Sequence, residues 1–311
     1  MQSTFFYSPE YDYSLGLLSC LHPFEGRKYS IALRLLEQSA GQRVSPRAPE
    51  GPVSVEALLR VHDRSYLESL SKADRIASVL EVSLLRWVPA GVLQRRLVEP
   101  AKWACEGTLQ AVRWALEQKG MALNLGGGFH HAFADRGEGF CFFSDAAIAV
   151  ADAIAKKLLS CDDEIWLIDL DAHRGNGFED CLSQQTKLSV FDMYNFQVYP
   201  GLHQKDLPFM LPLKNCTDDA AYLEILKTEL PRFVEQSPRP ALVFYNAGTD
   251  VVLGDGVGRL GLSPSAVIER DRFVVDALRA LGVPTVVLTS GGYNSESPKL
   301  IAQLAQYVLQ D

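Results

Sequence analysis

The segment Asp169-Leu-Asp171-Ala-His173 holds the side chains of this chain that are best suited to chemistry. In an extended chain, a spacing of two places Asp169, Asp171 and His173 on one face. With Asp250 from a distant segment, Asp171 and His173 offer three ligands to a divalent metal, which leaves a position open for water or substrate. Such a metal can acidify water and polarise a carbonyl, so the pattern indicates metal-assisted hydrolysis. Taken alone, the pattern fits equally a strand end that exposes polar side chains to water.

Two histidines and a tyrosine extend this chemistry. His130 and His131 are adjacent and follow three glycines, while Tyr293 follows the pair Gly291-Gly292. Beside a hydrolytic metal, a histidine pair could take a proton from water and give one to a leaving amine. The Tyr293 hydroxyl could donate to a developing oxyanion. Each residue alone also has a structural explanation, as a buried or surface histidine or a loop aromatic, but the combination favours catalysis.

Apolar runs precede these segments. They indicate strands whose ends bring the segments close together. We expect buried strands at residues 121–125, 164–170, 241–246 and 284–289, with further strands at 188–193 and 1–7. We expect helices at 100–119, 145–159, 218–233, 298–310, from Pro264 onward, and at 54–69 with Ser54 as its cap, and a loop at 41–52. Alternating strands and helices predict an α/β fold around a mostly parallel sheet. The ligand site of such sheets lies beyond the carboxyl ends of the strands, where the polar residues occur.

The composition restricts the class of protein. The chain has 311 residues, 47% of them apolar and 22% charged, which is typical of a globular protein of one or two domains. The net charge is −8 and no long basic run occurs, so we expect no nucleic-acid partner. No apolar run approaches the roughly 18 residues that cross a bilayer, so we expect no membrane partner. Six scattered cysteines, with no Cys-x-x-Cys pair and no secretory leader, predict reduced thiols in a cytoplasmic protein.

Five ordered motifs resemble those of the histone deacetylase family, over roughly residues 20–305. They are Gly126-Gly-Gly-Phe-His-His131, Gly139-Phe-Cys141, Asp169-Leu-Asp-Ala-His173 with Gly175-Asn-Gly177, Asn246-Ala-Gly-Thr-Asp250, and Gly291-Gly-Tyr293. Within the family the chain is most similar to class IV, through His22-Pro-Phe24 with Lys28, Asp192-Met-Tyr-Asn195, Tyr199-Pro-Gly201, and Gly254-Asp255 with Gly258. The resemblance implies an α/β arginase-deacetylase fold, in which a single catalytic domain spans 1–311 around a mostly parallel sheet of about eight strands flanked by helices.

The resemblance also implies roles for individual residues. Zinc, or ferrous iron, would be held by Asp171, His173 and Asp250. A structural potassium ion would lie near residues 169–173. The substrate would lie in a tunnel with aromatic walls, and the residues assigned to substrate binding are Gly139, Phe140, Tyr199 and Gly292. Lys28 matches a cationic position that lines a cavity behind the metal, and a surface lysine is the equal alternative.

The implied catalytic residues are the histidine pair, its two partners and the tyrosine. His130 and His131 would transfer protons, and Tyr293 would contact the substrate carbonyl. Asp169 matches the family's partner of His130, and Asn176 matches the partner of His131. Because an asparagine cannot stabilise an imidazolium by charge, we expect His131 to be the less basic histidine and the better general acid.

The sequence departs from better-known family members at the rim of the tunnel. The expected rim is residues 86–100, which are rich in apolar side chains and have Glu99 as their only acid. We therefore find no match there for the rim carboxylate that holds the peptide backbone in those relatives.

The expected function is hydrolysis of acyl-lysine amides in proteins or peptides, with an acyl group that is acetyl or longer. A deacylase of small amines such as acetylpolyamines is the alternative. A non-catalytic module that binds acyl-lysine is a third possibility, and the retention of every metal and proton-transfer position argues against it.

Overall fold

Seven parallel strands form one sheet in the part of the chain that the computed structural model describes, residues 1–13, 25–40, 45–201 and 208–310. Their order across the sheet is β1-β2-β7-β6-β3-β4-β5. In that order the strands are Ser3–Phe6, Met121–Asn124, Thr285–Leu288, Leu242–Asn246, Glu164–Asp169, Lys187–Asn195 and Met210–Leu213. The predicted parallel α/β sheet is confirmed, with seven described strands where about eight were expected. Cys20 and the motif residues His22, Pro23 and Phe24 lie outside the described residues.

The central strands are buried on both faces, as their continuous apolar runs predict. All residues of β2, β6 and β7 are buried, and Glu164 is the one residue of β3 that is partly exposed. The sequence does not predict β5, because four residues are too few to show a period and Pro212 removes a backbone donor. The proline is tolerated because β5 lies at the edge of the described sheet.

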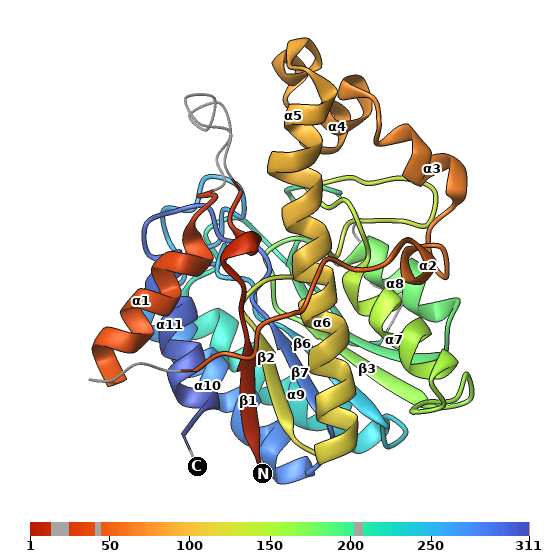
Figure 1. Cartoon of the computed structure of the whole chain (residues 1–311). Helices are drawn as coiled ribbons and strands as arrows, with labels where there is room; N and C mark the ends of the chain where they lie inside the picture. Colours follow the sequence, from red (N-terminus) through yellow and green to blue (C-terminus); the bar gives the residue numbers. More distant parts are fainter. Residues whose placement is uncertain (14–24, 41–44, 202–207, 311) are drawn as a thin grey trace.

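Helices cover both faces of the sheet (Figure 1). One layer contains α6 (Glu99–Gln118), α7 (Asp145–Ala155) and α8 (Asn176–Ser183), and the other contains α1 (Lys28–Ala40), α9 (Asp219–Gln236), α10 (Pro264–Leu281) and α11 (Ser297–Val308). Ser263 caps α10 as predicted, since its Oγ accepts from Ala266 N at 3.2 Å. Within the described ranges, no helix combines the length and apolar character that a bilayer span requires.

The predicted helix at 54–69 is wrong as one helix. Ser54 caps α2 (Val55–Leu58), but the chain then leaves the helix and forms α3 (Arg64–Ser69) after a break. His62 lies in the break, and its two ring nitrogens are each 3.0 Å from a backbone atom, Phe133 O and Ser144 N. These tertiary contacts outweigh the local helical pattern. Val55, the first residue of α2, is 60% exposed.

Short elements between α3 and α6 form a projection at the upper end of the molecule in Figure 1. They are α4 (Ala73–Val79), a 3₁₀ helix (Ser83–Trp87), α5 (Ala90–Leu93) and a π-helical turn (Gln94–Val98) that leads into α6. A further 3₁₀ helix (Pro9–Tyr11) follows β1. The segment expected as the tunnel rim therefore forms part of this projection, where Trp87 is 81% exposed.

The carboxyl ends of five strands align in one row across the sheet. Asn124 of β2 is in register with Leu288 of β7, and Leu288 with Asn246 of β6. Asn246 is in register with Asp169 of β3, and Phe6, the last residue of β1, with Asn124. The loops that carry the sequence motifs follow these residues directly, so the parallel topology brings distant segments of the chain to one edge of the sheet.

Candidate active site

Asp171, His173 and Asp250 form a buried cluster whose ligand atoms all lie within 4.8 Å of one another. Asp171 and His173 lie in the loop after β3, and Asp250 lies in the loop after the neighbouring β6. His173 Nδ1 is 3.1 Å from Asp171 Oδ1 and 2.8 Å from Asp250 Oδ2. The approach of Asp250 Oδ2 to His173 Nδ1 lacks hydrogen-bond geometry, so this buried oxygen has no hydrogen-bond partner among the described residues. This donor set and its free carboxylate oxygen fit a divalent metal.

Backbone N–H groups hold the outer oxygens of the two carboxylates. Ala172 N donates to Asp250 Oδ1 at 2.9 Å, and Gly291 N donates to Asp171 Oδ2 at 2.8 Å. A Cβ on Gly291 would lie 2.5 Å from Asp171 Oδ2, and one on Gly248 would lie 2.3 Å from the same oxygen. Both positions require glycine because the backbone approaches the cluster this closely.

The cluster perturbs the pKa of each of its members. Burial alone would raise the pKa of Asp171, but the positive charges of His130 and His173 bring it well below its usual range. Burial, and then the charge of Asp171, raise the pKa of Asp250 to about 7. Burial would lower the pKa of His173, but the two carboxylates raise it well above its usual value. Two buried carboxylates thus compete for one imidazolium, and a divalent cation would satisfy both.

His130 pairs with Asp169, the last residue of β3. His130 Nδ1 is 2.8 Å from Asp169 Oδ2, and Asn246 Nδ2 donates to Asp169 Oδ1 at 2.9 Å. Burial would lower the pKa of His130, but the charges of Asp169 and Asp171 raise it to about 9. A pKa of about 9 leaves His130 protonated at neutral pH.

His131 lies against His130, with ring centroids 4.1 Å apart, but has a neutral partner. Its Nδ1 is 2.8 Å from Asn176 Oδ1, which also accepts from Gly177 N at 3.1 Å. Because this oxygen is an acceptor, Nδ1 carries the proton and Nε2 presents a lone pair. Burial, and then the positive charges of His130 and His173, hold the pKa of His131 well below its usual range. The adjacent histidines therefore differ in charge at neutral pH, as their partners predict.

Tyr293 lies after β7 and faces the same site. Its ring centroid is 6.4 Å from that of His173 and 5.9 Å from that of Phe140. Burial, and then the charge of Asp250, raise the pKa of Tyr293 well above its usual value, so its hydroxyl stays protonated. Asp255 holds the backbone here, because its Oδ2 accepts from Tyr293 N at 2.8 Å. Tyr293 can therefore donate a hydrogen bond to a ligand in the site.

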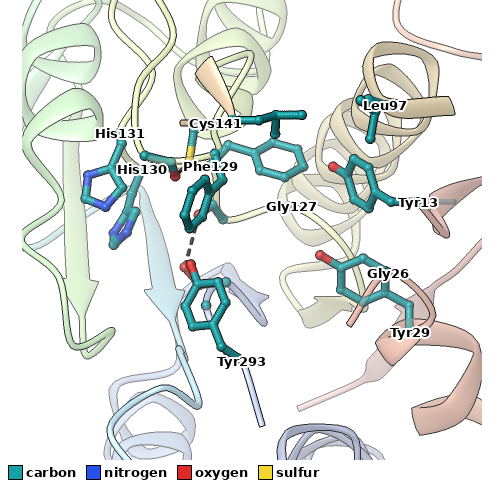
Figure 2. A pocket seen from close by; sticks show the side chains of 16 residues that line it. Tyr13, Gly26, Tyr29, Leu97, Gly127, Phe129, His130, His131, Cys141 and Tyr293 are labelled. Carbon is teal, nitrogen blue, oxygen red and sulfur yellow. Dashed lines mark hydrogen bonds between the residues drawn. The ribbon is translucent and has the colours of Figure 1, made fainter. Parts of the chain in front are cut away.

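A pocket extends from the histidine pair between aromatic side chains (Figure 2). In Figure 2, His130 and His131 lie on one side of it and Tyr13 and Tyr29 on the other. The described residues that line it are Tyr13, Gly26, Tyr29, Leu80, Leu97, Gly127, Gly128, Phe129, His130, His131, Gly139, Phe140, Cys141, Ser290, Gly291 and Tyr293. The lining is mostly apolar with a few polar groups at one end, which suits a ligand with an apolar part.

Of the predicted substrate-binding residues, Gly139 and Phe140 line this pocket. Tyr199 lies at its edge, with its ring centroid 4.9 Å from that of His131, and it lines a neighbouring surface cavity. Gly292 does not line the pocket: a Cβ there would lie 2.1 Å from the hydroxyls of two buried neighbours. The adjacent Gly291 lines the pocket in its place.

Lys28 is fully buried, so the alternative of a surface lysine is wrong. Its Nζ donates to the carbonyl of Ser290 at 2.5 Å, and Ser290 lines the pocket. Burial lowers the pKa of Lys28 to about 8, although Asp171 and Asp250 act in the opposite direction. Lys28 therefore lies next to the pocket wall, within electrostatic reach of the metal cluster.

The pocket entrance is the partly exposed side at Gly139, Phe140 and Tyr199. Two glutamates that bond to this side are absent from the sequence prediction. The carboxylate of Glu81 accepts the backbone N–H of Gly139, and the carboxylate of Glu138 accepts the hydroxyl of Tyr199. Of the expected rim segment 86–100, Leu97 is the one residue that lines the pocket. Glu138 could have been found because it adjoins the Gly139 motif, whereas nothing near Glu81 in the sequence points to the site.

Comparisons with known proteins identify the family to which the chain is similar. Residues 22–310 match the family model of the histone deacetylase domain. The chain is 34% identical to histone deacetylase 2 of Arabidopsis thaliana over 298 residues, which are 95% of this chain and 76% of that protein. It is also 34% identical to an uncharacterized protein of Picosynechococcus, over 74% of this chain and 76% of that protein.

A solved structure gives independent support for the fold. The crystal structure of the HDA15 HD domain matches 99% of this chain and 88% of its own chain, with a TM-score of 0.75 and 18% sequence identity. At that identity the match establishes the fold alone. The domain match and the relative from Arabidopsis establish the family: the chain belongs to the histone deacetylase family.

Proposed function

We propose that this protein is a metal-dependent deacylase that hydrolyses the amide of acylated lysine side chains. One observation carries the proposal: a three-ligand cluster, two adjacent histidines with opposite pKa shifts and a protonated tyrosine surround one pocket. Membership of the histone deacetylase family supports hydrolysis of an acylated amine. In the reaction, the alkyl stem of the lysine lies between Phe140 and Tyr199, and the acyl group enters the pocket.

The charges of the site define the proposed chemistry. A divalent ion held by Asp171, His173 and Asp250 would polarise the substrate carbonyl and acidify the attacking water. The Tyr293 hydroxyl donates to the carbonyl oxygen as negative charge develops on it.

The two histidines have different roles in the proposed reaction. Neutral His131 accepts a proton from the attacking water through Nε2 and then gives it to the departing amine. Because burial and its neutral partner keep the pKa of His131 low, its protonated form is a strong acid toward that amine. His130 stays protonated beside Asp169 and stabilises negative charge in the site.

We propose zinc as the ion, with ferrous iron as the alternative, since an Asp-His-Asp set suits both. We also propose a structural potassium ion next to residues 169–173. Its support is Asp192, a buried residue in register with Asp169, whose Oδ1 has no hydrogen-bond partner among the described residues. Burial, and then the charge of Asp169, raise the pKa of Asp192 well above its usual range. A monovalent cation there would satisfy the unpaired oxygen.

We propose that the acyl group is longer than acetyl. The support is the mostly apolar lining of the pocket, to which Leu80, Leu97 and Phe129 contribute besides the tyrosines. Lengthening acetyl to octanoyl stabilises binding by at most about 5 kcal/mol, at about 0.8 kcal/mol per buried methylene. We expect about 2–3 kcal/mol after imperfect packing, which is roughly 30- to 150-fold in kcat/KM.

A second candidate function is deacylation of small acylated amines. The carboxylate of Glu81, which accepts the Gly139 N–H beside the pocket, favours it, because it could attract a second cationic group of such a substrate. The same Glu81 carboxylate could instead accept backbone N–H groups of a peptide. For either substrate we propose an enzyme of the class IV type that acts in the cytoplasm; the support is the motif at Asp192 and the free thiols of the described cysteines.

One activity panel tests these proposals. It compares acetyl-, octanoyl- and myristoyl-lysine peptides with acetylated polyamines, on protein loaded with zinc or ferrous iron. We expect a higher kcat/KM for the octanoyl peptide than for the acetyl peptide and the acetylated polyamines. Equal turnover of acetyl and octanoyl peptides would overturn the chain-length proposal. Preference for the polyamine would move the function to the second candidate, and no turnover of any substrate would refute a deacylase.

A further inference from the structure

A four-residue turn, from Glu138 to Cys141, forms one side of the pocket entrance. Cys141 N donates to Glu138 O at 2.8 Å, and the two residues form an isolated antiparallel bridge. The central residues Gly139 and Phe140 have φ angles of +51° and +68°, as in the turns that close tight hairpins. Phe140 is thus held in a left-handed conformation that side chains rarely adopt.

Contacts on two sides fix this turn in place. Phe140 N donates to Val79 O at 3.0 Å, which ties the turn to the end of α4. A Cβ on Gly139 would lie 2.4 Å from the ring of His131, so the turn packs directly on the catalytic histidine. The turn therefore places Phe140 as one wall of the entrance.

The side chain at the start of the turn reaches the opposite wall. Glu138 Oε2 accepts a hydrogen bond from the Tyr199 hydroxyl. Its other oxygen, Oε1, accepts from Arg136 Nε at 2.5 Å, and the Arg136 guanidinium lies 3.8 Å from the centre of the Phe133 ring. The Glu138 carboxylate is therefore held on one side by Arg136, which stacks on Phe133, and on the other side it binds the hydroxyl of Tyr199.

Tyr199 needs such an anchor because it is 37% exposed at the protein surface. On one side, the Tyr199 ring contacts the ring of His131 edge-on, with an interplanar angle of 85°. Its hydroxyl also interacts with the side chain of Asn176. An exposed aromatic ring keeps a fixed orientation only when its polar end is bonded, and Glu138 is the charged acceptor that bonds it.

We propose that Glu138 is a positioning residue that fixes Tyr199 as the second wall of the substrate channel. One short turn then sets both walls, Phe140 directly and Tyr199 through the Glu138 carboxylate. This inference rests on the proposed function for its kinetic consequence. The geometric part, an anchored Tyr199 ring, stands independently of the reaction.

The proposal predicts an effect on substrate binding more than on chemistry. Tyr199 would contact the unreactive alkyl stem of the substrate. This contact stabilises the bound substrate and the transition state equally. The His131–Asn176 bond does not depend on Glu138, because Gly177 N also holds Asn176 Oδ1, at 3.1 Å. Loss of Glu138 should therefore raise KM and leave kcat nearly unchanged.

The kinetic test compares Glu138→Ala, Glu138→Gln and Tyr199→Phe on one acyl-lysine peptide. Glu138→Ala should raise KM roughly three- to tenfold, the value of one hydrogen bond, with kcat within about twofold. Glu138→Gln keeps an acceptor and should restore most of the loss. Glu138→Ala added to Tyr199→Phe should cost little more than Tyr199→Phe alone, because both changes remove the same bond. Asp180→Ala is the matched control, since it removes an exposed acid of the same surface cavity that does not bond Tyr199.

A second measurement needs no activity. The protein is labelled with 3-fluorotyrosine, and the ¹⁹F signal of Tyr199 is assigned by its absence in Tyr199→Phe. Glu138→Ala should move this signal toward that of free fluorotyrosine, and Glu138→Gln and Asp180→Ala should not. An unmoved signal in Glu138→Ala would overturn the anchor even if the deacylase proposal fails. A moved signal with lower kcat and unchanged KM would overturn the channel-wall role and show that Glu138 acts on His131.

Discussion

Replacing Asn176 with aspartate would test the division of charge between the two histidines. The change keeps the shape of the side chain and places a negative charge 2.8 Å from His131 Nδ1. The Gly177 N–H that now donates to Asn176 Oδ1 would donate to the new carboxylate. Asn176 is the first residue of α8, where an acid interacts favourably with the helix dipole, so folding should be unaffected.

The size of the effect follows from the distance. At about 4 Å and an effective dielectric constant of about 20, two unit charges interact by about 4 kcal/mol, or about three pKa units. The cost of burying the new carboxylate reduces this, so we expect the pKa of His131 to rise by about one to three units. His130 shows the same effect, since its carboxylate partner Asp169 helps to raise its pKa to about 9.

The sign of the pH dependence is fixed by the role of His131. Protonated His131 cannot accept a proton from water, so kcat/KM falls as the pH drops through its pKa. In the unaltered protein the pKa of His131 lies well below its usual value. The fall of kcat/KM on the acid side of the pH profile should therefore occur in the same low pH range. Asn176→Asp should move that limb upward by about one to three pH units and leave activity at high pH largely intact.

The assay is kcat/KM for one acyl-lysine peptide across the pH range, with metal content and melting temperature measured on the same samples. The pH at which kcat/KM falls to half should lie about one to three units higher for the variant than for the unaltered protein. An acid limb in the same place for both proteins would refute the role of His131 as the neutral proton acceptor. A loss of activity that is equal at every pH would show damage to the site in place of a pKa change.

Three further predictions concern other parts of the site. Asp171→Ala or Asp250→Ala should abolish bound metal and activity, because removal of one of three ligands weakens the site strongly; elemental analysis showing stoichiometric metal in either variant would contradict the assignment. Tyr293→Phe should lower kcat by roughly 10²- to 10³-fold with unchanged metal content, and near-normal turnover would remove the tyrosine from the mechanism. Glu81→Ala should raise KM for a peptide substrate more than for the matching small acyl-lysine amide if Glu81 holds the peptide backbone. Equal effects on both substrates would argue against that contact.

The centre of the site could be predicted from sequence because it follows from the parallel topology. Asp169 and Asn246 end neighbouring strands in register, so the loops after them must meet at one edge of the sheet. The spacing Asp-x-Asp-x-His then brings Asp171 and His173 together, and Asp250 follows Asn246 by four residues. Resemblance to a family predicts Asp169 and Asn176 as partners of the histidines, and the structure places each within 2.8 Å of its histidine. The catalytic roles of the histidines stay predictions.

The entrance could not be predicted in the same way, because long-range contacts determine it. Glu81 lies within the projection, just after α4, and reaches Gly139 with its own backbone in a left-handed conformation, φ +57°. The break at His62 arises from hydrogen bonds to residues more than 70 positions away along the chain. Local patterns of apolar residues contain no information about such contacts, and the helix predicted at 54–69 fails for that reason.

This difference between centre and entrance has a functional consequence. The pKa difference between His130 and His131 depends on Asp169 and Asn176, which the strand β3 and the helix α8 hold in place. The channel wall depends on Glu138, in a turn bonded to the projection and to Tyr199. Since Glu138 hydrogen-bonds to neither histidine and Gly177 N also holds Asn176, a substitution at Glu138 can alter substrate choice without altering the acid–base chemistry. Proteins of this fold can therefore keep the site at the strand ends while the residues around its mouth select a different acylated amine.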